Sequence, residues 1–437
     1  MSWINKILKG DRVIWVVMLM LGIISLIAVY SATSKEAYDN IGAYNKQILI
    51  RHAATVFGGF VTMFIASRIN YRRYSRAIEL VLLFCFILLI FTTFMGDRSH
   101  NASRSFMGFQ PSEIAKIVLI VYLAKYIVIW NSRDYKFKDL IVPIFLPIFL
   151  IVTPIFPENL STAAMLFTVC IVMLFIGQIK FKHILIILGI AVLGLTLYIL
   201  TDETVATIRQ NRYDKLVAEA NLHPKDASLQ ERIKKKPRVS RVKTWQSRTK
   251  KEEGAVADST ARKTLKITDS NRQKMYAKMA VARGGLFGKG SGKSTQRNFL
   301  PKPYNDCIYA IIIEEYGLVG GAFVMLLYII LLTRTVLVMK KRPLTFGAMM
   351  SFGIAFILIM QAMINMGVST GLLPITGQQL PFVSKGGTSM LMTGFAIGMI
   401  LSVTRSVEDT ENKERNEETT ESETEEKVET EQIITES

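Results

Sequence analysis

The segment from His183 to Leu200 reads HILIILGIAVLGLTLYIL and contains no aspartate, glutamate, lysine or arginine. A helix needs about 20 predominantly apolar residues to cross a hydrocarbon core of about 30 Å, and this segment approaches that length. The stretch from Val81 to Met95 is equally free of charge. Half of the 437 residues are hydrophobic, which excludes an intrinsically disordered chain and indicates an integral membrane protein.

Apolar runs of this kind recur along the chain and predict an all-α integral membrane fold of ten transmembrane helices. The expected ranges are 13–31, 53–67, 78–95, 111–130, 139–156, 160–177, 183–200, 307–333, 345–366 and 388–404. The first range follows Lys6, Lys9 and Arg12 and could be mistaken for a signal peptide. It is too long for the apolar part of one, so we expect a retained first span.

Basic residues divide unequally between the two sets of short loops. The N-terminus and the loops after the second, fourth, sixth and eighth spans hold 16 lysines and arginines, and the opposite short loops hold 6. The positive-inside rule therefore places both termini in the cytoplasm. The large loop 201–306, between spans seven and eight, then lies outside, because long segments translocate largely regardless of their charge.

The chain is predicted to divide into a membrane domain, 1–406, and an acidic, disordered cytoplasmic tail, 407–437, which should be unnecessary for chemistry. Within the large loop, the patterns from Ile208 to Leu216 and from Met275 to Arg283 favour amphipathic helices at the outer leaflet, the alternative being a disordered basic loop. The basic run 232–251 could be mistaken for a nucleic-acid patch. Outside the cell it would meet lipid phosphates or a pyrophosphate-bearing substrate and no nucleic acid.

Two other kinds of site are excluded by spacing. The three cysteines and four histidines are scattered, so no metal site is expected. The stretch Gly288-Lys-Gly-Ser-Gly-Lys-Ser-Thr295 superficially resembles a phosphate-binding P-loop. That motif would require glycine at the position of Phe287, and no strand precedes it, so nucleotide hydrolysis is not expected.

Charged residues inside membrane spans usually face a protein interior or a cavity, and Glu113, Lys116, Glu314 and Glu315 are of this kind. Glu113 and Lys116 lie three residues apart, so they share a helix face and can pair. The sequence leaves open whether this pair has a purely structural or a functional role. The loop 365–389 is rich in glycine and proline, which favours a re-entrant loop lining a site over an ordinary exposed turn.

Four blocks of sequence, in their order and in their placement relative to the spans, resemble the SEDS family, which includes FtsW, RodA and SpoVE. The blocks are Ala102-Ser-Arg104 with Gln110-Pro-Ser-Glu-Ile-Ala-Lys116, Gly284-Gly-Leu-Phe-Gly-Lys-Gly290 with Ser294-Thr-Gln296, Leu300-Pro301 through Asn305-Asp306 to Glu314-Glu-Tyr-Gly317, and the loop 365–389. The third block is most similar to FtsW. The chain departs from the family pattern at Ser105, Asn159, Asn298 and Lys385.

The resemblance implies a peptidoglycan glycosyltransferase that polymerises lipid II on the outer face of the cytoplasmic membrane, in septal wall synthesis during cell division. It implies that Asp306 is the catalytic residue. The substrate-binding residues that it implies are Arg104, Glu113, Lys116, Thr376 and Ser384. From the residues alone, a cap of the following helix by Asn305 and Asp306 is the favoured interpretation, and capping by Asn305 is compatible with catalysis by Asp306.

The resemblance also implies partners: a class B penicillin-binding protein that crosslinks the new glycan, other divisome proteins and membrane lipids. It implies no dedicated cofactor and leaves a divalent cation open. Two alternatives stand beside this interpretation, a RodA-like polymerase of elongation and a lipid II flippase. Intramembrane charges would suit a flippase as well as an enzyme, but an acid at the outer surface favours the enzyme.

Overall fold

The computed structural model describes residues 9–39, 43–95, 97–99, 102–105, 110–157, 159–222, 272–300 and 303–410. Its long helices are α2 (Arg12–Asp39), α3 (Ala43–Arg68), α4 (Tyr71–Met95), α5 (Pro111–Asn131), α8 (Leu160–Ile176), α9 (Phe181–Leu222), α13 (Ile308–Lys341) and α14 (Phe346–Thr370), followed by a last helix, Gly387–Thr410. Between α5 and α8, a continuous helical segment comprises α6 (Phe137–Leu140), the π-helix η1 (Ile141–Phe145) and α7 (Leu146–Ile155). Each of the ten predicted ranges overlaps one of these helices or this segment.

Eight helices in the described part of the chain are long and apolar enough to cross a membrane. The two remaining predicted ranges coincide with α5, which contains Glu113, Lys116 and Lys125, and with α8, which has 17 residues. The prediction of a helical, multi-pass membrane protein is confirmed at this level.

Helix α14 and the last helix form the centre of the bundle, and the outer helices present apolar side chains to the lipid. The apolar window of α14 is 78% buried and that of the last helix 72%, whereas that of α4 is 28% buried. On α4, Leu80, Leu83 and Phe84 are all more than half exposed. A helix that is apolar on every side is expected where the surrounding solvent is hydrocarbon.

Small residues let the central helices approach closely. A side chain on Gly353 of α14 would place its Cβ 2.6 Å from Ile120 on α5 and 2.6 Å from Met173 on α8. Both contacts are shorter than van der Waals distance, so only glycine fits there without a shift of its neighbours. Packing of helix backbones over small residues is the usual means of association inside a membrane.

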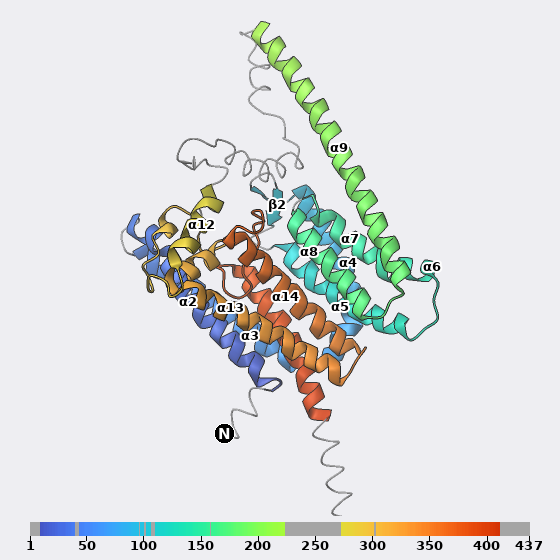
Figure 1. Ribbon diagram of the computed structural model, residues 1–437. Helices are drawn as coiled ribbons and strands as arrows, with labels where there is room; N and C mark the ends of the chain where they lie inside the picture. The colour runs from blue at the N-terminus through green and yellow to red at the C-terminus, as the bar shows by residue number, and fades with distance from the viewer. Residues whose placement is uncertain are drawn as a thin grey trace, which may run out of the picture.

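Helix α9 is longer than expected. The prediction ended this helix at Leu200, but it continues to Leu222, with 42 residues in all, and projects well beyond the bundle (Figure 1). At about 1.5 Å per residue it is about 63 Å long, roughly twice the hydrocarbon thickness. The loop predicted to begin at residue 201 therefore begins as helix, and the segment 208–216, predicted as a separate amphipathic helix, is part of α9. Residues 223–271, with the basic run 232–251, lie outside the described residues.

Other differences are smaller. The last helix continues to Thr410, beyond the boundary at 406, and residues 411–437 of the predicted tail lie outside the described part of the chain. After α4 comes a two-stranded antiparallel hairpin, β1 (Asp97–Ser99) and β2 (Ala102–Ser105), which the all-α prediction missed. In so short a hairpin the backbone groups pair with each other, but the side chains show no apolar periodicity from which the strands could be predicted.

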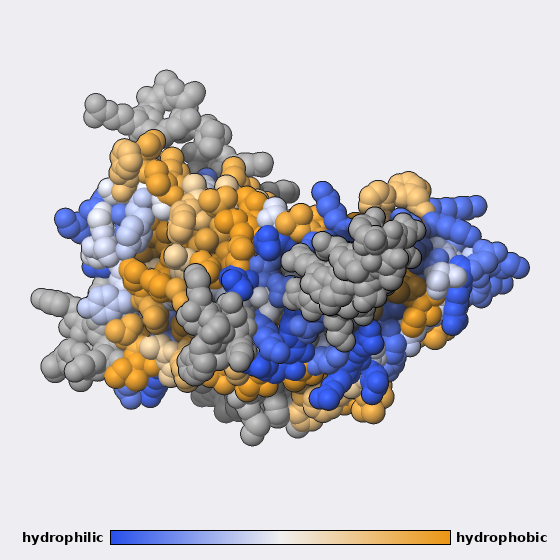
Figure 2. Space-filling model, turned by 90° about the horizontal axis from the view of Figure 1, so that it is seen from below, coloured by the Kyte–Doolittle hydropathy of each residue, from blue (hydrophilic) through white to orange (hydrophobic). Residues whose placement is uncertain are grey.

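The end of the bundle at which α4 begins and the last helix finishes is seen in Figure 2. Hydrophilic residues gather over part of this face, and hydrophobic residues border them. The opposite end carries α12 (Arg272–Gly284) and β2, and α9 projects from it (Figure 1). The amphipathic helix predicted at 275–283 is thus confirmed as a helix. It packs against α13, with Ala277 and Ala280 buried.

The glycine-rich loop after α12 fits a kink in α13. Gly317, inside α13, has φ of 71°, a left-handed conformation that glycine adopts without cost. A Cβ on Gly317 would lie 2.1 Å from the carbonyl oxygen of Leu286, and one on Gly284 would lie 2.1 Å from that of Ile313. Any side chain at these two positions would therefore force the loop and the helix apart.

The stretch that resembles a P-loop surrounds a carboxylate of its own chain. Glu314 is fully buried, and its carboxylate accepts hydrogen bonds from the backbone N–H groups of Thr295 and Gln296, each at 3.2 Å. It also accepts from the Ser294 hydroxyl and from Lys289 Nζ, at 2.9 Å for the lysine. Glycine-rich loops bind anions with backbone N–H groups in this way, and here the anion is the carboxylate of Glu314 itself.

We expect Glu314→Gln to lower the free energy of unfolding by about 3 kcal/mol, because it removes the charge that Lys289 and four other donors satisfy in a buried site. Thermal unfolding in detergent, followed by size-exclusion chromatography, would measure the loss. The matched control is Glu79→Gln. Glu79 pairs with Lys125 but is 43% exposed, so its loss should cost less than about 1 kcal/mol. Equal effects from both variants would contradict the prediction.

Candidate active site

Asp306 lies on a turn directly before α13, and its side chain is half-buried. The N-cap position of α13 is occupied by Cys307, which makes no side-chain capping bond. The alternative prediction, which put Asn305 or Asp306 at the N-cap of this helix, is therefore wrong about that position. The turn continues through Cys307, so Asn305 and Asp306 both lie outside the N-cap position.

The backbone of Asp306 is held by an amide from α14. Asn365 Nδ2 donates to the carbonyl oxygen of Asp306 at 3.0 Å and to that of Gln378 at 2.7 Å. Gln378 in turn donates through Nε2 to the hydroxyl of Thr162 on α8, at 2.6 Å. One buried amide therefore joins the Asp306 turn, the loop after α14 and, through Gln378, helix α8.

The loop between α14 and the last helix holds the two residues before Asp306. Ser384 Oγ donates to the carbonyl oxygen of Asn305 at 2.6 Å and accepts from the backbone N–H of Leu380 at 2.9 Å. The backbone N–H of Lys385 donates to the carbonyl oxygen of Tyr304 at 3.0 Å, and its ammonium lies 4.4 Å from the centre of the Tyr304 ring. The carbonyls of residues 304–306 are thus all fixed, and the turn is preorganised.

Lys116 forms the second part of the site. Its side chain is 4% exposed, and Nζ donates to Glu113 Oε1 at 2.8 Å and to Gln361 Oε1 at 3.0 Å. Glu113 also lies 3.5 Å from the hydroxyl of Ser389, and Gln361 Nε2 donates to the carbonyl oxygen of Gln379 at 3.0 Å. The predicted pairing of Glu113 with Lys116 is confirmed, and Glu113 orients the ammonium.

Helix α14 links the two parts. Gln361, which contacts Lys116, and Asn365, which contacts the Asp306 turn, are four residues apart and so lie one above the other on one face. Sequence reasoning did not assign a role to either amide. The available signal was the occurrence of two amides one turn apart in an otherwise apolar span, because polar residues there are costly.

Three buried polar atoms in this region have no hydrogen-bond partner among the described residues. They are the Oγ1 atom of Thr376, the Oδ1 atom of Asn365 and the Oγ atom of Ser369. Buried polar groups are nearly always satisfied, so such a group requires a water, an ion or a ligand. The predicted substrate contact Thr376 therefore has a free hydroxyl at the site, whereas the hydroxyl of Ser384 is engaged by the protein backbone.

Arg104, the remaining predicted site residue, lies on β2, at the same end of the bundle as α12 (Figure 1). Its side chain lies outside the described part of the structure. Within that part, no three side chains of histidine, cysteine, aspartate and glutamate gather as a metal site. The arrangement therefore consists of one half-buried carboxylate, one buried ammonium with its own carboxylate, and hydroxyl and amide groups between them.

Comparisons with known proteins agree with this architecture. A profile of the cell cycle proteins FtsW, RodA and SpoVE matches residues 11–409. Stage V sporulation protein E of Bacillus subtilis is 30% identical over 92% of this chain and 98% of its own length. The probable peptidoglycan glycosyltransferase FtsW of Geobacter metallireducens is 30% identical over 93% of this chain and 98% of its own length.

Two solved structures share the fold. A chain of a peptidoglycan synthase complex superposes with a TM-score of 0.61 at 21% identity, over 91% of this chain and 98% of that one. The rod shape determining protein RodA of Thermus thermophilus gives a TM-score of 0.59 at 20% identity, over 93% and 98% of the two chains. With the profile match over nearly its whole length, the chain belongs to the family of cell cycle proteins that comprises FtsW, RodA and SpoVE.

Proposed function

We propose that this protein is a peptidoglycan glycosyltransferase that polymerises lipid II on the outer face of the bacterial cytoplasmic membrane. The observation that carries the proposal is the placement of Asp306. Its carboxylate is half-buried, on a turn whose backbone is fixed by Asn365 and Ser384. Asn365 lies on the same face of α14 as Gln361, which binds the ammonium of Lys116. The glycosyltransferase names of relatives that align over nearly the whole chain support the same activity.

The reaction needs a base and a cation. Asp306 takes the proton from the hydroxyl of the acceptor sugar while that oxygen forms its bond to the anomeric carbon of the donor. The bond between that carbon and the pyrophosphate oxygen breaks, and the lipid pyrophosphate leaves with the electron pair. Negative charge grows on the leaving group, and Lys116 and Arg104 stabilise it. Because the net charge gained in the transition state lies on the pyrophosphate, fixed cations lower the barrier.

The hydroxyl residues then divide into two roles. Thr376 Oγ1 is buried and has no hydrogen-bond partner among the described residues, which supports a direct hydrogen bond to the substrate. The hydroxyl of Ser384 is engaged by Asn305 and Leu380, which supports a role in positioning the Asp306 turn in place of the expected substrate contact. Lys116 remains in the substrate site, with Glu113 reducing the cost of its burial.

The proposed topology has ten spans, both termini in the cytoplasm and the Asp306 end outside. A reporter fused after Pro237 should therefore read extracytoplasmic, and one fused after Lys341 should read cytoplasmic, as the 16-to-6 division of basic residues requires. Alkaline phosphatase and fluorescent-protein fusions would measure this in living cells. A cytoplasmic signal at Pro237 would overturn the outer-face mechanism.

The cellular role that we propose is septal synthesis together with a class B penicillin-binding protein and other divisome proteins. The fold shared with a chain of a peptidoglycan synthase complex supports a transpeptidase partner, and the FtsW names among the relatives support division. Imaging of a fluorescent fusion tests the role. Midcell signal agrees with division, and a dispersed peripheral signal would favour the RodA-like alternative.

Polymerisation by purified components tests the activity itself. The protein, its class B partner and lipid II should yield long glycan strands that can be resolved by gel electrophoresis. The parallel experiment places the protein in vesicles and follows transfer of labelled lipid II between the two leaflets. Transfer without polymer would overturn the enzyme proposal and support the flippase alternative.

A further inference from the structure

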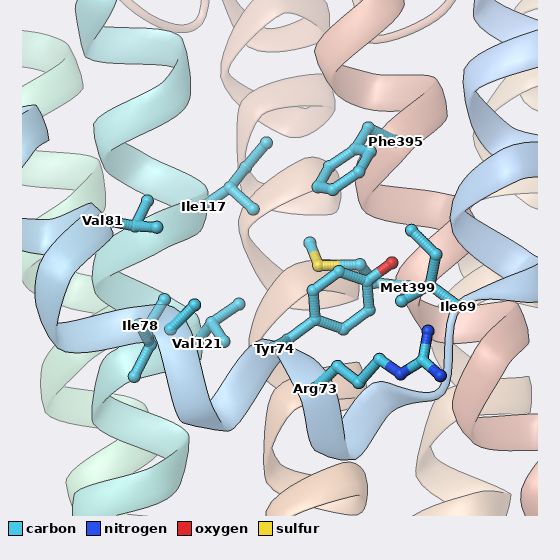
Figure 3. Close-up of a pocket in the computed structure, with 10 residues that line it drawn as sticks. Ile69, Arg73, Tyr74, Ile78, Val81, Ile117, Val121, Phe395 and Met399 are labelled. Atoms are coloured by element: carbon cyan, nitrogen blue, oxygen red, sulfur yellow. The ribbon is translucent and has the colours of Figure 1, made fainter.

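A cavity of about 260 Å³ lies between α4, α5 and the last helix, in the half of the bundle where α4 begins. Asp306 is remote from it, at the end where α13 begins. Figure 3 shows Ile117 and Phe395 at one end of the cavity, Tyr74 and Met399 in its middle, and Arg73 at the other end. None of these side chains contributes to the proposed catalytic site.

The cavity is built to hold hydrocarbon. Its lining is apolar apart from Arg73 and the hydroxyl of Tyr74, and that hydroxyl is already engaged, donating to the carbonyl oxygen of Ala66 at 3.1 Å. Apolar cavities stay dry, and one of about 150 Å³ is enough to bind a benzene ring. Leu80 and Leu83, on the same helix, are exposed where lipid chains surround the bundle. The solvent nearest to the cavity is therefore acyl chain.

The charge at the mouth of the cavity selects the head group. The guanidinium of Arg73 is exposed, and no acid pairs with it among the described residues. Arg72 precedes it and Arg76 follows it on the same helix. The nearest carboxylate in sequence, Glu79, is neutralised by Lys125. Of these arginines only Arg73 lines the cavity. An arginine without an acidic partner at the edge of an apolar groove matches a phosphate at the membrane surface, because arginine offers a fork of donors to phosphate oxygens.

We propose that this cavity binds one acyl chain of an anionic phospholipid, with the head-group phosphate on Arg73. In the proposed orientation this lipid comes from the cytoplasmic leaflet, whereas lipid II is used on the outer one. The bound chain fills the space between Ile78 on α4 and Met399 on the last helix. It thereby supports the helix that follows the loop holding the Asp306 turn.

The test uses the full-length protein in nanodiscs that contain phosphatidylglycerol with a photoreactive diazirine in one acyl chain. After irradiation, mass spectrometry maps the labelled residues. Labelling should concentrate on the cavity residues Ile78, Val121 and Met399 over the lipid-facing residues Leu83 and Phe84. Phosphatidylcholine with the same chain should label the cavity roughly fivefold less, since it lacks the net charge that an arginine attracts.

Two variants and their controls distinguish the site from the general surface. Arg73→Gln should reduce cavity labelling by roughly fivefold, and the neighbouring Arg72→Gln should not. Ala77→Phe, which fills the cavity, should abolish cavity labelling, whereas Ala54→Phe on the exposed face of α3 should leave it unchanged. Each variant is accepted only if it elutes and melts like the wild type.

Three results would overturn the proposal. Labelling that is no stronger in the cavity than on Leu83 and Phe84 would show that the cavity is not a lipid site. Equal labelling by phosphatidylcholine and phosphatidylglycerol would remove the role of Arg73. The third result is a competition experiment in which unlabelled lipids displace the probe. If undecaprenyl phosphate displaces it at a lower membrane fraction than unlabelled phosphatidylglycerol does, the cavity binds a polyprenyl lipid and not a phospholipid.

Discussion

Replacing Asp306 by asparagine should abolish glycan polymerisation while the protein still inserts, purifies and binds its class B partner. An amide does not accept a proton at working pH, so loss of the base should reduce turnover by roughly 100-fold to 10,000-fold. The fold should survive, because the contacts that fix this turn use the backbone carbonyl of Asp306, which the substitution keeps. Polymerisation of purified lipid II by wild type and variant, each with the same partner, measures the loss.

The control for this experiment is Asp134→Asn, which removes a fully exposed carboxylate and should leave turnover unchanged. Asn365→Ala provides a second comparison, since it keeps the carboxylate of Asp306 but releases the carbonyl beneath it. This variant should keep measurable activity with a reduced turnover. If Asp306→Asn polymerises at a near-normal rate, Asp306 is not the general base, whatever Asn365→Ala does.

The spans could be predicted from sequence because each apolar run reports directly on its own environment. The full extent of α9 could not, since its outer half carries Asp202, Glu203 and Arg209 and no longer resembles a span. The length of this outer half depends on continuous backbone hydrogen bonding, and the hydropathy of the side chains does not reveal such bonding. The hairpin of β1 and β2 could not be predicted for a related reason. Strands of three and four residues contain too few side chains to show the alternation of apolar and polar residues that marks a strand.

The site was partly predictable. Glu113 and Lys116 are close in sequence, and their pairing follows from helical spacing alone. The contacts that fix Asp306 cannot be derived in this way, because Asn365 is 59 residues from Asp306 and Ser384 is 79 residues from Asn305. Such contacts depend on how the helices pack. The same holds for Glu314, whose partners in the glycine-rich loop are brought to it by the kink at Gly317.

Lys116→Met should reduce polymerisation by roughly 100-fold to 1,000-fold, because it removes a fixed positive charge from the position where we place the departing pyrophosphate. Stability should fall as well, since the carboxylate of Glu113 and the Oε1 atom of Gln361 both lose the donor that satisfies them. Loss of activity in this single variant therefore does not separate a catalytic from a structural role.

The double variant Glu113→Gln with Lys116→Met separates the two roles. Replacing both partners of a buried pair removes the unpaired charge, so thermal stability in detergent should recover toward that of the wild type. If Lys116 stabilises the leaving group, polymerisation should remain as low as in Lys116→Met, because the restored fold still lacks the cation. Recovery of activity together with stability would mean that the pair only supports the helices. The leaving group would then depend on Arg104, and Arg104→Gln would become the decisive variant.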